Sequence, residues 1–355
     1  MNVLVRATNW VGDAVMSIPA LRAIRAARPG AEITVLARPW VAELYAREDF
    51  ADSVLVYDTR SKHAGIRGRF RLAAELRGRR FDCAILLPNS FDAAFLAWQA
   101  KIPRRIGYAR DGRSVLLTDA IPPPRPGAIP PHQRYYYLEL LRRAGLLATL
   151  PEFPEIRLHG DAAAGRELLR HFGLRGERII GVSPGAAFGS AKRWLPERFA
   201  AAASDLAAEW DAEVAVFGTA SEAQLCGAVA QAVGPPARSL AGRTSLGQFI
   251  DLAAACLAFL TNDSGAMHIA SAVGVPTVAV FGATDPAATG PTASLARIVR
   301  TPVECSPCLL RECPIDHRCM TRVEAAAVAG ETRRLVALAA RAQEVPAHGH
   351  AQQDR

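Results

Sequence analysis

The chain has 355 residues, of which 50% are hydrophobic and 21% are charged, a composition typical of a globular protein with room for two domains. No hydrophobic run approaches the roughly 18 to 20 residues of a membrane-spanning helix. The first residues, MNVLVRATNW, begin directly as a strand without the pattern of a secretory signal. We therefore expect a cytoplasmic protein.

The net charge of +8 is unevenly distributed along the chain. Residues 1–150 contain 23 Lys and Arg against 13 Asp and Glu, whereas the remainder contains 19 against 21. A general preference for arginine over lysine explains the residue type but not this asymmetry. The first half is therefore expected to meet an anionic partner, and nucleic acid, anionic lipid and a phosphorylated sugar are all open.

Strand-like runs alternate with amphipathic helical patterns in the first half. Predicted strands lie at 2–6, 32–37, 53–58 and 83–88, and predicted helices at 20–30, 68–80 and 135–147. Pro29-Gly30 ends the first of these helices. The proline-rich segment 121–134 is expected to be a loop, and 148–156 reads as the linker between domains.

The same alternation restarts in the second half. Strands are predicted at 179–185, 213–218, 256–263 and 277–282. Strands that alternate with helices are typical of parallel sheets covered on both faces. We therefore predict an α/β protein with two Rossmann-like domains facing one cleft. The expected boundaries are 1–150, a linker at 151–160, a second domain at 161–344 and a disordered tail at 345–355.

Ligands of parallel sheets lie beyond the carboxyl ends of the strands, and the first strand ends in a polar corner. Thr8-Asn9-Trp10-Val11-Gly12-Asp13 is expected to form a loop leading into a helix, with Gly12 permitting the turn. Asp13 would then stand at the cleft. The alternative is that Asp13 is only a helix N-cap, for which Asp is among the best residues.

A second corner, VSPGAAFGSAKRWLPERFA, follows the strand at 179–183. Its small residues and Lys192 suit a phosphate or diphosphate, although it matches neither the Walker pattern nor G-x-G-x-x-G. The alternative for Lys192 is a solvated surface lysine. Pro196 is well placed to open the next helix.

The third corner is TNDSGAMH, where a buried run ends at Asn262-Asp263 and Ser264-Gly265 turns the chain. A helix is expected to start near Ala266, and its free amides and partial positive charge favour an anion. Ser264 could cap this helix or donate to a phosphate, and His268 lies in the first turn.

Five segments together resemble a known family, glycosyltransferase family 9, the lipopolysaccharide heptosyltransferases, and within it the heptosyltransferase II group. They are NWVGDAVMSIPALRAIR, LPNSFDAAFLAWQAKIPRRIGY, PGAAFGSAKRW, TNDSGAMHIASAVGVPTVAVFGATDP and CSPCLLRECPIDHRCM. The resemblance implies a GT-B fold. It also implies transfer of L-glycero-D-manno-heptose from ADP-heptose to the inner core of lipopolysaccharide, with inversion at the anomeric carbon.

The resemblance also implies roles for individual residues. Asp13 would be the catalytic base, and Lys192 with the 263–268 corner would hold the donor diphosphate. The expected donor-binding set is Thr8, Gly185, Lys192, Glu222, Thr244, Asp263, Ser264, Gly265 and His268. Within it, Glu222 would accept the ribose hydroxyls, and the alternative for Thr244 is a cap for the helix that follows it. Because no Asp-x-Asp motif occurs, we expect Lys192 and a helix N-terminus to replace a catalytic cation, with no cofactor.

The acceptor is expected to be an anionic molecule of the Kdo–lipid A type, reached at the cytoplasmic face of the inner membrane through peripheral contact, and no nucleic-acid partner is expected. The basic region after the third strand is the candidate acceptor site, and its alternative is a solvated helix face. Its members are Arg60, Lys62, His63, Arg67, Arg69 and Arg71.

The spacing of Cys305, Cys308, Cys313 and Cys319, with His317 nearby, could ligate zinc or an iron–sulfur cluster. Packed, reduced thiols are the favoured interpretation. Two other functions stay open: a related transferase with a protein or another glycan as acceptor, and a nucleotide- or zinc-binding module without activity. An intact Asp13 and Lys192 argue against the module, because a binder needs no base at the cleft.

Overall fold

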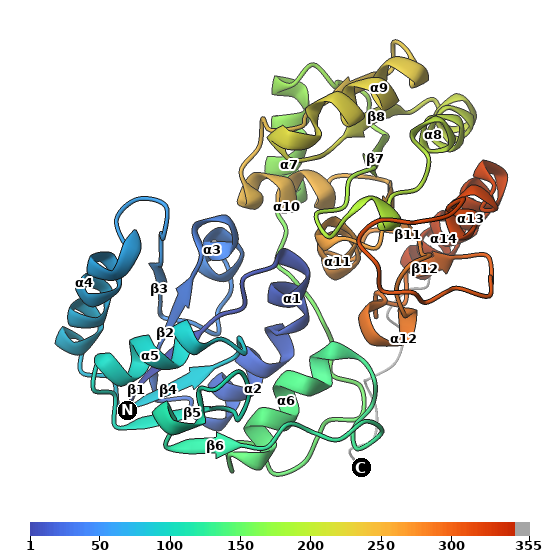
Figure 1. Ribbon diagram of the computed structural model, residues 1–355. Helices are drawn as coiled ribbons and strands as arrows, with labels where there is room; N and C mark the ends of the chain where they lie inside the picture. The colour runs from blue at the N-terminus through green and yellow to red at the C-terminus, as the bar shows by residue number, and fades with distance from the viewer. Residues whose placement is uncertain (345–355) are drawn as a thin grey trace, which may run out of the picture.

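The computed structural model describes residues 1–344, and the predicted tail at 345–355 lies outside the described residues. The chain forms two α/β units, each built on a parallel six-stranded sheet (Figure 1). None of the described helices is both long enough and hydrophobic enough to cross a bilayer.

The first unit has the strand order β3-β2-β1-β4-β5-β6. Its strands are β1 (Asn2–Arg6), β2 (Glu32–Ala37), β3 (Ser53–Val56), β4 (Cys83–Leu86), β5 (Arg104–Tyr108) and β6 (Asp119–Ile121). Its helices are α1 (Val11–Met16), α2 (Ile18–Ala27), α3 (Pro39–Ala46), α4 (Gly65–Gly78), α5 (Phe91–Gln99) and α6 (Gln133–Arg143). Val3 in the central strand β1 pairs with Ile33 on one side and Cys83 on the other, and all three are buried.

The second unit repeats this topology, with the order β12-β11-β10-β7-β8-β9. Its strands are β7 (Ile179–Ser183), β8 (Glu213–Val216), β9 (Ala237–Ser239), β10 (Ala258–Asn262), β11 (Thr277–Val280) and β12 (Ala296–Val299). Its helices are α7 (Ala162–His171), α8 (Pro196–Trp210), α9 (Ala223–Val233), α10 (Leu246–Ala254), α11 (Gly265–Ala272), α12 (Pro286–Thr289), α13 (Arg318–Thr321) and α14 (Ala325–Glu344). Short 3-10 turns η1 (Ser114–Leu116), η2 (Ser190–Lys192) and η3 (Ala220–Glu222) complete the elements.

Both sheets reverse their strand order at one point, between β1 and β4 in the first unit and between β7 and β10 in the second. Ligands of such sheets bind in the crevice outside these switch points. The three corners singled out in the sequence follow β1, β7 and β10. The fold therefore brings all three to the predicted binding edges.

The predicted α/β class and all eight predicted strands are confirmed. Four strands were not predicted: β5, β6, β9 and β12. They lie toward the sheet edges. β5 begins with two arginines, β6 and β9 have three residues each, and β12 has four, so these strands lack the hydrophobic run of a central strand. The domain boundaries remain a prediction.

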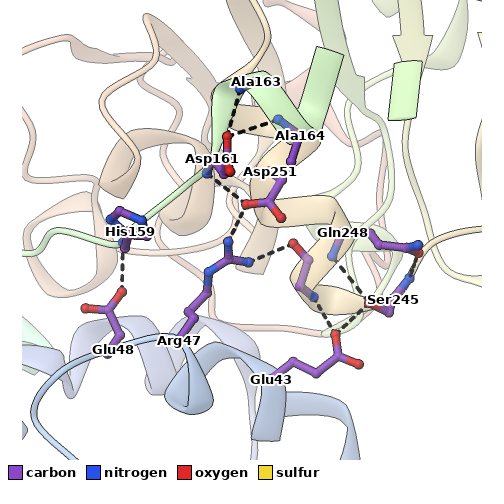
Figure 2. A network of polar contacts seen from close by, with 11 residues as sticks. Glu43, Arg47, Glu48, His159, Asp161, Ala163, Ala164, Ser245, Gln248 and Asp251 are labelled. Atoms are coloured by element: carbon purple, nitrogen blue, oxygen red, sulfur yellow. Dashed lines mark hydrogen bonds and ion pairs between the residues drawn. The ribbon is translucent and has the colours of Figure 1, made fainter. Parts of the chain in front are cut away.

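The two units contact each other through hydrogen bonds and one ion pair where α3 meets α10 (Figure 2). Glu43 accepts hydrogen bonds from the Ser245 hydroxyl and the Gly247 amide, both at 2.6 Å. Arg47 forms an ion pair with Asp251. A carboxylate at the start of α10 is favourable because it faces the partial positive charge of the helix N-terminus.

Candidate active site

A cavity of about 1030 Å³ is lined by residues of both units. The first unit contributes side chains from α1 and α3, including Asp13 and Trp40, and the second contributes the segments that follow β7, β8 and β10. A cavity of this size lies at the upper end of the range for small-molecule binding sites. Among the predicted site residues, those that line it are Asp13, Gly185, Lys192, Glu222, Thr244, Asp263, Ser264, Gly265 and His268.

Asp13 lies in the first turn of α1 rather than in a loop. The helix begins at Val11, and the N-cap position is Trp10, so the N-cap alternative for Asp13 is wrong. Burial raises the pKa of the Asp13 carboxyl, while a hydrogen bond from Tyr137 and the charge of Lys192 lower it. A carboxylate with a raised pKa that faces a cavity is suited to accept a proton.

The reason predicted for Gly12 was wrong, because Gly12 lies within α1 and makes no turn of its own. The space beside it explains the residue: a Cβ at Gly12 would lie 3.1 Å from the His268 ring in α11. In the facing helix, a Cβ at Gly265 would lie 2.8 Å from Cβ of Val11. Two glycines therefore allow α1 and α11 to approach closely across the boundary between the units.

Lys192 is not the solvated lysine of the alternative interpretation. Its side chain is 13% exposed, and its Nζ lies 2.6 Å from Oδ2 of Asp263, whose side chain is 4% exposed. The hydroxyl of Thr284 also donates to that oxygen. The ion pair joins the corner after β7 to the corner after β10 and places a cation at the cavity wall.

Asn262, at the end of β10, fixes the segment that carries Lys192. Its Oδ1 accepts from the Trp194 amide at 2.8 Å, and its Nδ2 donates to the Pro184 carbonyl at 2.7 Å. Asn262 is fully buried. One amide side chain thus ties both ends of the segment to the strand edge.

Helix α11 starts at Gly265, and Ser264 occupies its N-cap position without capping it through its side chain. The Ser264 hydroxyl instead shares a hydrogen bond with Thr261. Burial lowers the pKa of His268 to about 4, opposed by the charge of Asp263. His268 is therefore neutral at physiological pH, and it can offer a hydrogen bond but no positive charge.

Glu222 and Gly185 lie in direct contact, since a Cβ at Gly185 would lie 2.0 Å from a Glu222 oxygen. The other oxygen of Glu222 accepts from the amide and hydroxyl of Thr219, both at 2.9 Å. The helix-cap alternative for Thr244 is wrong, because the cap of α10 is Ser245. Thr8 is buried and does not line the cavity.

Several cavity residues were not predicted from the sequence. Arg311 comes from the cysteine-containing segment, where its carbonyl accepts from the Ala191 amide at 3.0 Å and its guanidinium lies 5.3 Å from the Phe188 ring. Trp10 and Trp40 line the first unit's wall and are 60% and 42% exposed. No local pattern identifies these residues.

The basic region predicted to bind the acceptor does not line the cavity. Lys62 pairs with Glu75 at 3.1 Å, and Arg69 pairs with Asp92 at 2.6 Å. The side chain of His63 is buried. Arg67 and Arg71 are exposed on α4. The guanidinium of Arg60 lies 5.5 Å from the ring of Trp40, which lines the cavity.

The cysteines are free thiols. Within residues 1–344, no group of three or more His, Cys, Asp or Glu side chains is arranged to hold a metal ion. His317 contacts the Ala191 carbonyl at 3.0 Å. The segment thereby supports the turn that carries Lys192.

Two Rossmann-type units that share one cavity form the GT-B architecture. The sequence pattern of glycosyltransferase family 9 (heptosyltransferase) matches residues 69–318. The chain belongs to this family.

Similarity to individual family members extends over most of the chain. The chain is 35% identical to lipooligosaccharide heptosyltransferase 2 of Haemophilus influenzae over 84% of this chain and 88% of that protein. It is 34% identical to lipopolysaccharide heptosyltransferase 2 of Escherichia coli over the same shares. The solved structure of ADP-heptose LPS heptosyltransferase II of E. coli superposes with a TM-score of 0.83 at 30% identity, covering 96% of this chain and all of the other.

Proposed function

We propose that this protein transfers L-glycero-D-manno-heptose from ADP-heptose to the anionic heptose/Kdo inner core of lipopolysaccharide, at the cytoplasmic face of the inner membrane. The observation that carries the proposal is the shared cavity, which Asp13 lines from the first unit and Lys192 from the second. In the same proposal the first unit (1–150) binds the acceptor and the second (161–344) binds the nucleotide sugar.

The acceptor hydroxyl loses its proton to the Asp13 carboxylate as its oxygen attacks the anomeric carbon. The bond between that carbon and the diphosphate oxygen breaks in the same displacement, which inverts the configuration and releases ADP. Burial of Asp13 supports this role because it brings the pKa of the base closer to neutral pH.

Lys192 and the N-terminus of α11 stabilise the charge that develops on the leaving diphosphate. A fixed cation and unpaired amides at a helix start are an anion site. The Ser264 hydroxyl and the neutral His268 ring each donate a hydrogen bond to the diphosphate there. One oxygen of Glu222 accepts a hydrogen bond from Thr219. The other lies beside Gly185 at the cavity, where it accepts a hydrogen bond from a ribose hydroxyl.

The test is transfer by the purified chain from ADP-heptose to acceptors with and without a first heptose on Kdo. The expected result is ADP release and a mass gain of one heptose on one of them, unchanged by a chelator. Activity that disappears with chelator and returns with Mg²⁺ contradicts the assignment of diphosphate stabilisation to Lys192 and α11. Transfer to a protein or another glycan, with none to either core acceptor, contradicts the proposed acceptor.

A further inference from the structure

Helices α4 and α5 of the first unit carry hydrophobic side chains that point away from the core. Ile66, Phe70, Phe91 and Trp98 are 58%, 46%, 52% and 46% exposed. Phe95 joins them: its ring centroid lies 6.0 Å from that of Phe70, 6.3 Å from Phe91 and 6.1 Å from Trp98. These five residues form the α4–α5 apolar surface.

This surface is separate from the packing of the two helices against their sheet. The sheet side of α4 is formed by Leu72, Ala73 and Leu76, and that of α5 by Ala94, Leu96 and Ala97. Each helix therefore has a second hydrophobic stripe that adds nothing to the core. Contiguous exposed hydrophobic surface is rare on proteins that stay in water and marks a docking site.

Free positive charge accompanies the α4–α5 apolar surface. Arg67 and Arg71 follow Ile66 and Phe70 on α4, both are exposed, and no ion pair within residues 1–344 involves either of them. The two carboxylates on these helices are already occupied, Glu75 by Lys62 and Asp92 by Arg69. The charge left free around the aromatic rings is therefore positive.

Position in the fold is the third observation. Helices α4 and α5 lie on the side of the first unit away from the second unit (Figure 1). The loop that leads into α4 also carries Arg60, whose guanidinium reaches the Trp40 ring at the cavity wall. This loop therefore links the α4–α5 apolar surface to the rim of the cavity, and the surface itself does not line the cavity.

We propose that the α4–α5 apolar surface docks this protein on an anionic lipid bilayer. Aromatic side chains favour the bilayer interface, and arginines beside them bind the phosphates of anionic lipids. The inference rests on the proposed function in one respect: an acceptor anchored by lipid gives such docking its purpose. Arg67 and Arg71 then serve the membrane that presents the acceptor and not the acceptor sugar.

The test is cosedimentation of the full chain with vesicles of phosphatidylcholine alone or with phosphatidylglycerol added. Wild type is expected to bind the anionic vesicles. The triple variant Phe70→Ser, Phe91→Ser, Trp98→Ser is expected to bind about tenfold less or weaker still. Arg67→Gln with Arg71→Gln should lower binding to anionic vesicles only and flatten its salt dependence. Phe153→Ser is the matched control, since Phe153 is 80% exposed outside these helices.

Activity separates this inference from the proposed function. The triple serine variant should keep wild-type kinetics on an acceptor stripped of its acyl chains and lose activity on the same acceptor held in vesicles. The docking proposal is overturned if the wild type does not bind anionic vesicles, or if the triple variant binds them as strongly as the wild type. A wild-type dimer that the triple variant dissociates, without vesicle binding, assigns the surface to a second copy and also overturns it. Absence of heptose transfer to the soluble acceptor by wild type contradicts the proposed function alone.

Discussion

The hydroxyl of Tyr137 in α6 donates a hydrogen bond to Oδ1 of Asp13 in α1, at 3.3 Å. Tyr137 is buried, and its hydrogen bond stabilises the ionised carboxylate against the burial that raises the pKa of Asp13. A residue of α6, which follows the last strand of the first sheet, thus lowers the pKa of the candidate base Asp13, which follows the first strand.

Replacing Tyr137 by Phe is expected to move the acid limb of the kcat/KM profile to higher pH. Without the hydrogen bond the carboxylate is less stable, so its pKa rises further and the base is protonated at a higher pH. We expect kcat/KM to fall about three- to tenfold at the acid end, with little change on the plateau. Tyr135→Phe is the control, because that hydroxyl bonds to the Glu152 carbonyl instead. Identical profiles for Tyr137→Phe and wild type would remove this contact from the mechanism.

Asp13→Asn should lower turnover by about 10² or more while leaving donor binding nearly intact. It should also stabilise the fold at neutral pH. Because the folded-state pKa of Asp13 is raised above 3.8, the folded state loses stability as pH rises through that pKa. The asparagine removes this loss, so we expect a Tm about 1 to 3 °C higher at about pH 8.

The gain in Tm for Asp13→Asn should shrink toward zero as pH falls below the ordinary pKa of Asp. Thermal unfolding across this pH range measures it. The exposed Asp111, replaced in the same way, is the control. A gain of equal size at all pH values would show that packing, and not the buried charge, is responsible.

Lys192→Ala is expected to lower both stability and affinity for ADP, and a second substitution separates the two effects. Removing the lysine leaves Asp263 buried without its partner, which costs about 3 kcal/mol for a buried pair. Lys192→Ala combined with Asp263→Asn should recover most of the stability, because the unpaired charge is gone. The affinity for ADP, measured by calorimetry, should stay low in the double variant. Recovery of affinity together with stability would assign Lys192 a structural role only.

Gly265→Ala should separate α1 from α11 and weaken nucleotide binding. The new Cβ would lie 2.8 Å from Cβ of Val11, too close for two carbon atoms, so the units must shift apart. We expect a loss of about 1 to 3 kcal/mol in stability and a raised KM for the donor. Gly227→Ala is the matched control, because it lies in α9 with no atom within 4 Å of its Cβ. That control should stabilise the helix by about 0.5 to 1 kcal/mol.

The sequence alone determined the alternation of strands and helices and the three corners that follow β1, β7 and β10. Hydrophobic periodicity is a local property, and parallel strands place their carboxyl ends at one edge of a sheet, so the residue pattern was enough to locate Asp13, Lys192 and Ser264. The edge strands β5, β6, β9 and β12 could not be located in this way, because neighbouring strands and not a hydrophobic run of their own hold them in place.

The tertiary structure decided which of these residues meet. The pairing of Lys192 with Asp263, the hydrogen bond from Tyr137 to Asp13 and the entry of Arg311 into the cavity join segments that are distant in sequence. Gly12 was explained by a turn that does not exist, since its true neighbour is His268 of the other unit. Arg67 and Arg71 of α4 were predicted to bind the acceptor, and the fold shows that both are exposed and do not line the cavity. A sequence pattern gives the face of a helix on which a residue lies, and only the packed fold shows what that face meets.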